Sequence, residues 1–299
     1  MPERFDLVVV GTGAAASTVA FACRKAGWSV AVAEARPFGG TCANRGCDPK
    51  KVLVGAAEAL DFARRMGPHG VAAEGLRIDW PALMRFKRSF TDPVPENTER
   101  SFAAAGIAAF HGTARFLDPQ TIAAGGATLR AEHWVIAAGA APARLGIPGE
   151  ELLITSDQFL EMAPVAGYEG RIVAANLLAG NHQKPNYLGC ASTVFSIPPL
   201  ASAGLTEEAA RRQGLQFDVR QDDTTGWYAS RRIAEECSGY KVLVERPGGR
   251  ILGAHILGDG AEELINVFAL AIRGGHTAQQ VKEPLYAYPT HGSNIQYMV

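Results

Sequence analysis

Residues 6–16 read Asp-Leu-Val-Val-Val-Gly-Thr-Gly-Ala-Ala-Ala, an apolar run that passes directly into a glycine-rich turn. The β-branched residues over 6–10 predict a buried parallel strand, and the alanine-rich stretch after the turn predicts a helix that ends at Gly27. A second apolar run over 29–33 predicts a strand that ends at the acidic Glu34. Strand, turn, helix, strand and acid in this order are typical of a dinucleotide-binding βαβ unit.

The glycines of this turn have a specific physical role. Gly11 and Gly13 let the backbone approach a pyrophosphate, whose charge meets the free N–H groups and the positive dipole end of the helix. Glu34 is placed to accept hydrogen bonds from ribose hydroxyls. Ala16 occupies the third glycine position of the motif. The alternative interpretation is a tight turn in another kind of α/β protein.

Two cysteines lie just downstream, in the segment 39–50, which reads GGTCANRGCDPK. The residues between Cys42 and Cys47 let the two sulfurs close a small disulfide ring. Such a pair stores two electrons when it lies beside a redox cofactor. The alternatives are two inert buried thiols or half of a zinc site. Because no second Cys or His cluster supplies further ligands, the sequence predicts no metal site.

The composition sets the broad class of the protein. A chain of 299 residues is long enough for two domains, and 47% hydrophobic and 20% charged residues are typical of a soluble globular protein. The formal charge is −1 and no basic run occurs, so nucleic acid is not an expected partner. No apolar run is long enough to span a membrane, and no signal peptide is recognisable. Five cysteines with one special pair predict a cytoplasmic protein.

The rest of the chain divides into shorter elements. Asp48 is expected to cap a helix that begins at Pro49 and runs to about Met66. Gly258-Asp259-Gly260 lies between a strand and a helix, and we interpret it as a structural turn rather than a second phosphate-binding motif. Periodicity and capping residues predict the remaining elements: a strand at 134–136 entering a glycine turn, a helix from 164 followed by a loop to 185, a short helix from Thr206 to Gly214, a hairpin of 240–245 and 251–257, an apolar helix over 261–273, and a capping box at Thr277 and Gln280.

By these residues the chain resembles the pyridine nucleotide-disulfide oxidoreductases, the group of glutathione reductase and dihydrolipoamide dehydrogenase. The segment 39–50 looks like the redox-active signature of that family. The resemblance implies a Rossmann-like α/β FAD-binding domain over 1–186 and an α+β dimerisation domain over 187–299. It also implies a homodimer that acts on a small-molecule or protein disulfide. Further similar segments are Gly112-Thr113-Ala114, Ala137-Ala138-Gly139, Thr155-Ser156-Asp157, 194–199 and Gly204-Leu205-Thr206-Glu207.

The resemblance also assigns roles to single residues. It implies that Cys47 is the thiol next to the flavin, that Cys42 exchanges with the substrate, and that Lys50 lies near the flavin N5. A helix N-terminus and a nearby lysine both stabilise a thiolate, the form that attacks a disulfide. The implied FAD-binding residues lie along the turns of the first domain: Gly11, Gly13, Ala15, Glu34, Ala35, Gly40, Thr41, Lys50, Ala114, Ala137 and Gly139.

One domain of the family has no counterpart in this sequence. The family carries a second βαβ module for NADH or NADPH, whereas residues 157–162 pass directly to Pro164-Val165-Ala166, which implies a deletion near 162–164. No second G-x-G-x-x-G motif with strand, helix and acid occurs. The family's later flavin motif, which ends in Gly-Asp, is missing with it. Losing that aspartate is expected to weaken FAD binding by about 1.5–3 kcal/mol.

The acid/base group departs from the family as well. The family presents a His-Pro dipeptide near the C-terminus and a glutamate shortly after it, but here Tyr288 replaces the histidine and Ser293 replaces the glutamate. Protonation of a leaving thiolate is then left to Tyr288, His291 or water. Histidine side chains titrate in the useful range, and His291 lies close by. The alternative for His291 is a surface histidine in a loop.

Two functions are compatible with the sequence. The first is an FAD-dependent dithiol/disulfide oxidoreductase that passes electrons between flavin and the Cys42–Cys47 disulfide and is impaired in NAD(P)H oxidation. The second is a catalytically inactive remnant that keeps only FAD binding and dimerisation.

Overall fold

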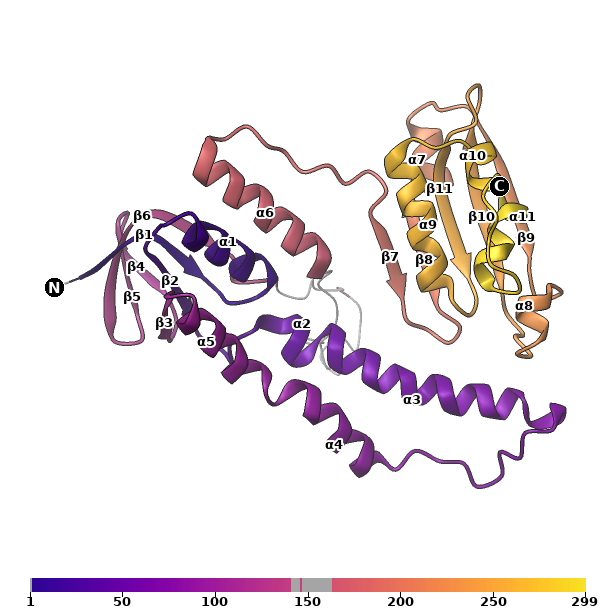
Figure 1. Ribbon diagram of the computed structural model, residues 1–299, viewed down its shortest axis with the longest axis horizontal. Coiled ribbons are helices and arrows are strands. Elements are labelled where there is room, and N and C mark those ends of the chain that lie inside the picture. The colour runs from indigo at the N-terminus through magenta and orange to yellow at the C-terminus, as the bar shows by residue number, and fades with distance from the viewer. Residues whose placement is uncertain (1, 141–145, 147–162) are drawn as a thin grey trace. The chain divides into compact units, whose positions relative to one another are not determined.

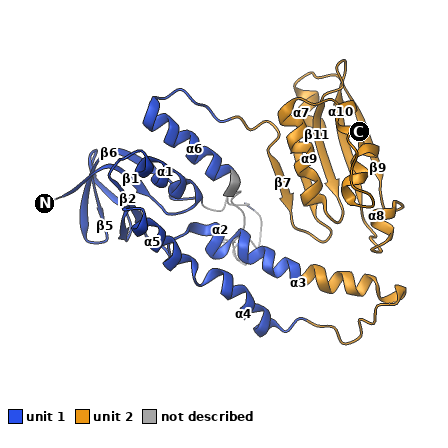
Figure 2. Cartoon of the chain, in the orientation of Figure 1, with its two compact units in different colours: residues 1–56, 78–185 blue, residues 57–77, 186–299 orange. Residues whose placement is uncertain are grey.

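The computed structural model describes residues 2–140, 146 and 163–299. The chain forms two compact units, which Figure 2 shows in different colours. Unit 1 comprises residues 1–56 and 78–185, and unit 2 comprises residues 57–77 and 186–299. The division into functional domains at 1–186 and 187–299 stays a prediction.

Unit 1 is built on a six-stranded sheet with the order β3-β2-β1-β6-β5-β4 (Figure 1). β1 pairs in parallel with β2 and β6, and β2 pairs in parallel with β3. β5 pairs antiparallel with both β4 and β6. The predicted βαβ unit therefore forms, with α1 (Ala14–Lys25) as its helix. The strands are β1 (Glu3–Val10), β2 (Val30–Glu34), β3 (Ala108–His111), β4 (Arg115–Asp118), β5 (Thr121–Ala124) and β6 (Ala127–Ile136).

The core of unit 1 lies on both faces of this sheet, because successive residues of a strand point in opposite directions. Leu7 and Val9 of β1 pack with α1 and with Phe102 of α5 (Val94–Ala104) on one face. Val8 packs on the other face in a cluster with Ile122 and Leu129. The helix α6 (Ala163–Ala179) packs against α1.

Two consecutive helices follow the second strand, α2 (Gly40–Arg45) and α3 (Cys47–Arg65). The prediction that Asp48 caps a helix beginning at Pro49 is wrong, because α3 begins at Cys47 and Asp48 lies in its first turn. The backbone carbonyl of Gly46 already accepts a hydrogen bond from the Lys50 N–H at 3.1 Å, so the helix starts without a side-chain cap. A 3₁₀ turn (Gly67–His69) and α4 (Trp80–Thr91) follow.

Unit 2 contains a five-stranded antiparallel sheet with the order β7-β8-β11-β10-β9. The helix α9 (Ala261–Gly274) covers one face, where Phe268 and Ile265 pack among Ala201, Val242 and Ile256. The strands are β7 (Ala191–Val194), β8 (Leu200–Gly204), β9 (Phe217–Asp223), β10 (Gly239–Glu245) and β11 (Ile251–Leu257). The further helices are α7 (Glu207–Arg212), α8 (Tyr228–Arg231), α10 (Ala278–Lys282), a 3₁₀ turn (His291–Asn294) and α11 (Ile295–Met298).

These elements confirm the predicted fold class, a Rossmann-like α/β part followed by an α+β part. The predicted hairpin is β10 paired with β11, and Thr206 caps α7 by accepting a hydrogen bond from the Ala209 N–H. The capping box of Thr277 and Gln280 is present. Among the described residues, no helix is both long enough and apolar enough to cross a membrane.

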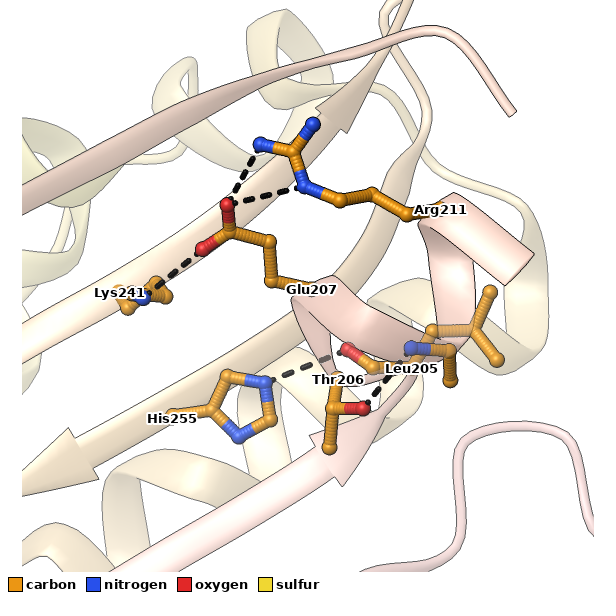
Figure 3. A network of polar contacts seen from close by, with 7 residues as sticks. Leu205, Thr206, Glu207, Arg211, Lys241 and His255 are labelled. Carbon is orange, nitrogen blue, oxygen red and sulfur yellow. Dashed lines mark hydrogen bonds and ion pairs between the residues drawn. The ribbon is translucent and has the colours of Figure 1, made fainter. Parts of the chain in front are cut away.

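A row of polar side chains occupies the face of the unit 2 sheet that α9 leaves uncovered (Figure 3). His255 lies directly opposite Ser202 on β8 and Lys241 on β10. Its Nε2 lies 3.2 Å from the Leu205 carbonyl, which can only accept, so Nε2 carries the proton and Nδ1 accepts from the Ser202 hydroxyl at 2.8 Å. Lys241 forms an ion pair of 2.9 Å with Glu207. The row therefore ties the first turn of α7 to the sheet.

This row makes the stability of unit 2 depend on pH. Burial lowers the pKa of His255 below its usual value near 6.5, so the stabilisation from the neutral imidazole is present above about pH 6.5 and is lost as the pH falls through the folded pKa. We expect His255→Gln to be less stable than wild type at pH 8 and to lose less stability on acidification. Thermal melts of both proteins between pH 5 and 8 measure the difference. A gap between the two melting temperatures that does not narrow toward pH 5 contradicts this assignment.

Candidate redox site

The turn between β1 and α1 has no room for a side chain at Gly11. A Cβ at Gly11, whose φ is +112°, would lie 2.2 Å from the carbonyl oxygen of Ala137. Gly13 occupies the N-cap of α1 and provides no side-chain hydrogen bond to the first turn. The N–H groups there are left for another acceptor, and the positive end of the helix dipole lies at the same place. This turn therefore fits a pyrophosphate, as a bound dinucleotide would present it.

Glu34 is anchored to the same turn. Its carboxylate accepts hydrogen bonds from the Thr12 N–H at 3.1 Å and the Thr12 hydroxyl at 2.9 Å. The other carboxylate oxygen accepts from the Arg36 N–H at 3.0 Å. The Thr12 hydroxyl also accepts from the Gly39 N–H at 3.1 Å. The acid expected to meet a ribose is therefore held at the turn, and the oxygen that accepts from Arg36 keeps one lone pair for a further donor.

The segment carrying the cysteines lies directly against this turn. A Cβ at Gly40 would lie 2.5 Å from the Cα of Gly13 and 3.2 Å from its nitrogen. Gly40 has a φ of +73°, a left-handed conformation that residues with a Cβ rarely adopt. Asn44 holds the start of α2 by donating from its side chain to the carbonyls of Phe38 at 2.8 Å and Gly40 at 2.9 Å. Gly13 and Gly40 thus bring two parts of unit 1 into contact. The first is the turn between β1 and α1, which we call the nucleotide-type turn, and the second is segment 39–50, which we call the dithiol segment.

Cys42 and Cys47 lie on two different helices that meet at Gly46. Cys42 is in α2 and Cys47 is the first residue of α3 (Figure 1). A Cβ at Gly46 would lie 3.0 Å from the Thr41 carbonyl oxygen and 3.1 Å from the Cα of Cys42, so a side chain here would crowd the backbone of α2. Both cysteines are half-buried thiols that interact with each other. The fold therefore brings the predicted redox pair together.

The surroundings of Cys42 keep its thiol protonated. Burial is the largest cause, and the hydrogen bond and charge of Cys47 and the charge of Asp48 add to it, raising the pKa of Cys42 to about 12. The expectation that a helix N-terminus and a lysine stabilise a thiolate on this pair is therefore wrong for Cys42. The positive charge of Lys50 is too weak against desolvation and two neighbouring negative groups.

Lys50 lies beside the pair as a buried cation. Its side chain is on the inner face of α3, and the residue is 8% exposed. Burial lowers the pKa of Lys50, and the charges of Cys47 and Cys42 act in the opposite direction. Ionisation of the thiol pair and protonation of Lys50 therefore favour each other.

The other predicted cofactor residues lie around the same turn or behind it. Ala137 donates its N–H to the Val10 carbonyl at 2.8 Å, and the next turn contains Gly139 with a φ of +85°. Ala15 lies in the first turn of α1, where its carbonyl oxygen would lie 2.9 Å from a Cβ at Gly170 of α6. Thr41 and Ala114 are half-buried and Ala35 is exposed. The motif at 155–157 lies outside the described residues.

Sequence reasoning gave no role to Arg45, which ends α2 between the two cysteines. Its Nε atom is buried and has no hydrogen-bond partner in the described part of the chain. The sequence did contain an indication that Arg45 belongs to the site, because Arg45 and Asp48 place opposite charges on either side of Cys47.

The C-terminal segment separates the two acid/base candidates. Tyr288 is 78% exposed, and its ring lies 6.5 Å from that of Tyr228. His291 is turned into unit 2, where its Nε2 lies 3.0 Å from a carboxylate oxygen of Asp259. The hydrogen bond from His291 is the main cause that lowers the pKa of Asp259. Ser293, at the position of the family's glutamate, forms a capping box with Thr290.

Asp259 belongs to the glycine turn that we predicted to be structural. The turn lies between β11 and α9, with Gly258 at a φ of +138° and Gly260 at +72°. A Cβ at Gly260 would lie 3.5 Å from the His291 ring, so the turn packs under the imidazole. The turn thus presents an acid to the C-terminal segment, a partner that sequence spacing does not reveal.

Comparison with known proteins identifies the family. Residues 5–170 match the family described as pyridine nucleotide-disulphide oxidoreductase, and residues 190–299 match the dimerisation domain of that family. The chain belongs to the pyridine nucleotide-disulphide oxidoreductase family. This is a family of flavin-dependent disulfide oxidoreductases, which confirms the resemblance read from the sequence.

Three relatives illustrate the extent of the match. A 19.7 kDa protein of the mercuric resistance operon of Staphylococcus aureus, described as uncharacterized, is 38% identical over 165 residues, 55% of this chain and 84% of that protein. Mercuric reductase of Streptomyces lividans is 30% identical over 296 residues, 92% of this chain and 60% of that enzyme. Dihydrolipoyl dehydrogenase of Bacillus subtilis is 35% identical over 131 residues, 44% of this chain and 28% of that enzyme.

The chain thus spans between 28% and 60% of the two named enzymes. The residues that the structure describes form one mixed sheet with a parallel βαβ unit and one antiparallel sheet, and among them no second dinucleotide-binding module occurs. The matched lengths are those of a chain shorter than its enzyme relatives. The deletion near 162–164 stays a prediction, because residues 147–162 lie outside the described part of the chain.

The Gly13–Gly40 contact gives a direct test of the site. We expect Gly40→Ala to destabilise unit 1 by about 1–3 kcal/mol, because its Cβ would overlap the Gly13 backbone at a left-handed position. The control is Gly55→Ala in α3, where nothing lies within 4 Å of the added Cβ. That change is expected to stabilise the helix by about 1 kcal/mol. Urea unfolding measures both, and equal effects of the two substitutions contradict the close contact.

The charge environment of Cys42 gives a second test. We expect Cys47→Ala to lower the pKa of Cys42 from about 12 but to leave it above 9, because burial remains after the Cys47 contributions are removed. The rate of alkylation of Cys42, followed by mass spectrometry between about pH 8 and 10.5, reports its thiolate fraction. The fully buried Cys23 serves as the unreactive reference. An unchanged alkylation profile in Cys47→Ala would show that the two thiols are not coupled.

Proposed function

We propose that unit 1 binds FAD and that the Cys42–Cys47 pair exchanges electrons with it. The observation that carries the proposal is the contact of Gly13 with Gly40, which holds the dithiol segment against the nucleotide-type turn. FAD, when bound, supplies a carrier that accepts or gives two electrons. The protein then acts in the cytoplasm as a dithiol/disulfide oxidoreductase.

The residues that would hold the cofactor are those of the turn. Gly11 and Gly13 leave space for the pyrophosphate, and the first N–H groups of α1 bind its oxygens. Glu34 keeps one free lone pair, on the oxygen that accepts from Arg36, for a ribose hydroxyl, while Thr12 fixes its position. The remaining proposed contacts are made by Ala15, Ala35, Gly40, Thr41, Lys50, Ala114, Ala137 and Gly139.

The chemistry on the protein side is a thiol–disulfide exchange. Cys42 attacks a substrate disulfide, one substrate thiol leaves, and Cys47 then attacks the mixed disulfide to release the second thiol and close the Cys42–Cys47 bond. Two protein thiols are oxidised and one substrate disulfide is reduced. Because the pKa of Cys42 is about 12, its proton must pass to a base before the attack. Lys50 stabilises the negative charge that remains on the pair.

Tyr288, His291 or water would exchange the proton with the leaving thiol. The exposure of Tyr288 favours it as the group that reaches a second molecule, whereas His291 is held by Asp259 within unit 2. We propose a homodimer in which the C-terminal segment of one subunit serves the disulfide of its partner. The match of residues 190–299 to the dimerisation domain supports this arrangement.

The second candidate function is a remnant that binds FAD and dimerises without turnover. Two observations favour it: the protonated state of Cys42, and the lack of a second dinucleotide module among the described residues. In either case nothing among those residues orients a nicotinamide against the flavin. Holding the nicotinamide and the flavin in the right geometry supplies a large part of the rate of hydride transfer.

The absorption spectrum of the purified protein distinguishes the two functions. We expect a bound-flavin band, and a new long-wavelength band after two-electron reduction, because the thiolate of Cys47 lies against the cofactor in the proposed arrangement. Cys47→Ser is expected to keep the first band and lose the second. A colourless protein, or a reduced protein without the long-wavelength band, favours the remnant.

Anaerobic titration tests the electron source. NADH and NADPH are expected to reduce the flavin slowly or not at all, whereas dithionite reduces it fully. Rapid bleaching at micromolar nicotinamide concentration would refute the impaired oxidation proposed here.

A further inference from the structure

A cavity of about 370 Å³ lies within unit 2. All of its lining residues belong to that unit, and they come from the second half of α3 and from segments around 198, 233 and 260. The volume falls in the range of small-molecule sites. Cys42, Cys47 and Lys50 do not line it, whereas Asp259, the partner of His291, does.

The cavity is strongly acidic. Its lining carries five carboxylates against two guanidinium groups, a formal excess of three negative charges. The two arginines are already engaged: Arg65 contacts Asp61 at 2.8 Å and donates to the Ile233 carbonyl, and Arg232 lies 3.5 Å from Nε2 of His291. The carboxylates belong to Glu58, Asp61, Glu235, Asp259 and Glu262.

Glu235 differs from Asp61 and Asp259 because its carboxylate is buried without an ion-pair partner among the described residues. The residue is 8% exposed and lines the cavity. In the described part of the chain no hydrogen bond or ion pair reaches its side chain, whereas Asp61 is paired with Arg65 and Asp259 with His291. A carboxylate removed from bulk water is costly unless a cation or hydrogen-bond donors satisfy it. A cation in the cavity would satisfy it.

The backbone fixes Glu235 in this position. Ala234 has a φ of +50°, the only positive φ of a non-glycine residue in the described chain. The Ala234 N–H donates to the Arg231 carbonyl at 3.1 Å, and the Glu235 N–H donates to the Ser230 carbonyl at 3.0 Å. The end of α8 therefore turns the chain so that Glu235 enters the interior.

The rest of the lining is apolar and comes from different segments, with Phe62 on α3 and Ile197, Pro198 and Ile233 elsewhere in the unit. We propose that the cavity binds a small organic cation, an ammonium group on a short apolar chain, with Glu235 as its counter-charge. The carboxylates select the charge and the apolar wall receives the chain. This proposal does not depend on the proposed redox function.

Calorimetry on the full chain tests the proposal, with putrescine as the probe and the uncharged diol of the same chain length as its control. Putrescine is expected to bind and the diol is not. Glu235→Gln keeps the side-chain shape and removes the charge, and it should weaken putrescine binding by about tenfold or more. The matched variant Glu208→Gln removes an exposed carboxylate of α7 that pairs with Arg212, and it should bind as wild type does.

Methyl NMR of the wild-type protein gives a measurement that does not depend on a variant. Putrescine should shift the methyl signals of Ile197 and Ile233 in the cavity and leave that of Ile122 in the core of unit 1 unchanged. Binding of the diol as tightly as the amine, unaltered binding by Glu235→Gln, or the absence of shifts at Ile197 and Ile233 under millimolar putrescine overturns the site.

Discussion

The close approach of Gly13 and Gly40 is the constraint on which the rest of unit 1 depends. It brings the backbone of the nucleotide-type turn to within contact distance of the segment that carries the cysteines, and Gly40 cannot gain a Cβ without overlapping the backbone of Gly13. Thr12 strengthens the same junction, because its hydroxyl connects Glu34 with the Gly39 N–H. A turn that fits a pyrophosphate and a pair of thiols are therefore held as one rigid piece, which is what electron exchange between a flavin and a dithiol requires.

The electrostatics of this piece favour the protonated form of Cys42. Burial and two negative neighbours hold the proton on Cys42, while burial also disfavours the charged form of Lys50. Each group becomes easier to ionise when the other does, so proton loss from the pair and charge on the lysine are coupled.

Unit 2 uses its acidic and basic side chains for different purposes on its different surfaces. On the sheet face shown in Figure 3, His255, Lys241 and Glu207 fasten α7 to the strands. At the C-terminal segment, Asp259 holds His291 and leaves Tyr288 exposed. In the cavity, Glu235 is buried without such a partner among the described residues. The first two arrangements satisfy their charges internally, and the third leaves one for a ligand.

The sequence alone determined the βαβ unit, the pairing of two cysteines in one short segment, the β10–β11 hairpin and the capped helices. These features depend on local chemistry, namely the period of apolar residues, glycine at turns and hydroxyl groups at helix ends. Only the tertiary structure decided that α3 begins at Cys47, that Cys42 stays protonated, that Asp259 pairs with His291 and that Glu235 faces a cavity. The reason is physical: burial and charge pairing are set by residues far apart in the chain, such as Asp259 and His291 or Arg65 and Ile233, whose distance in space no local pattern encodes.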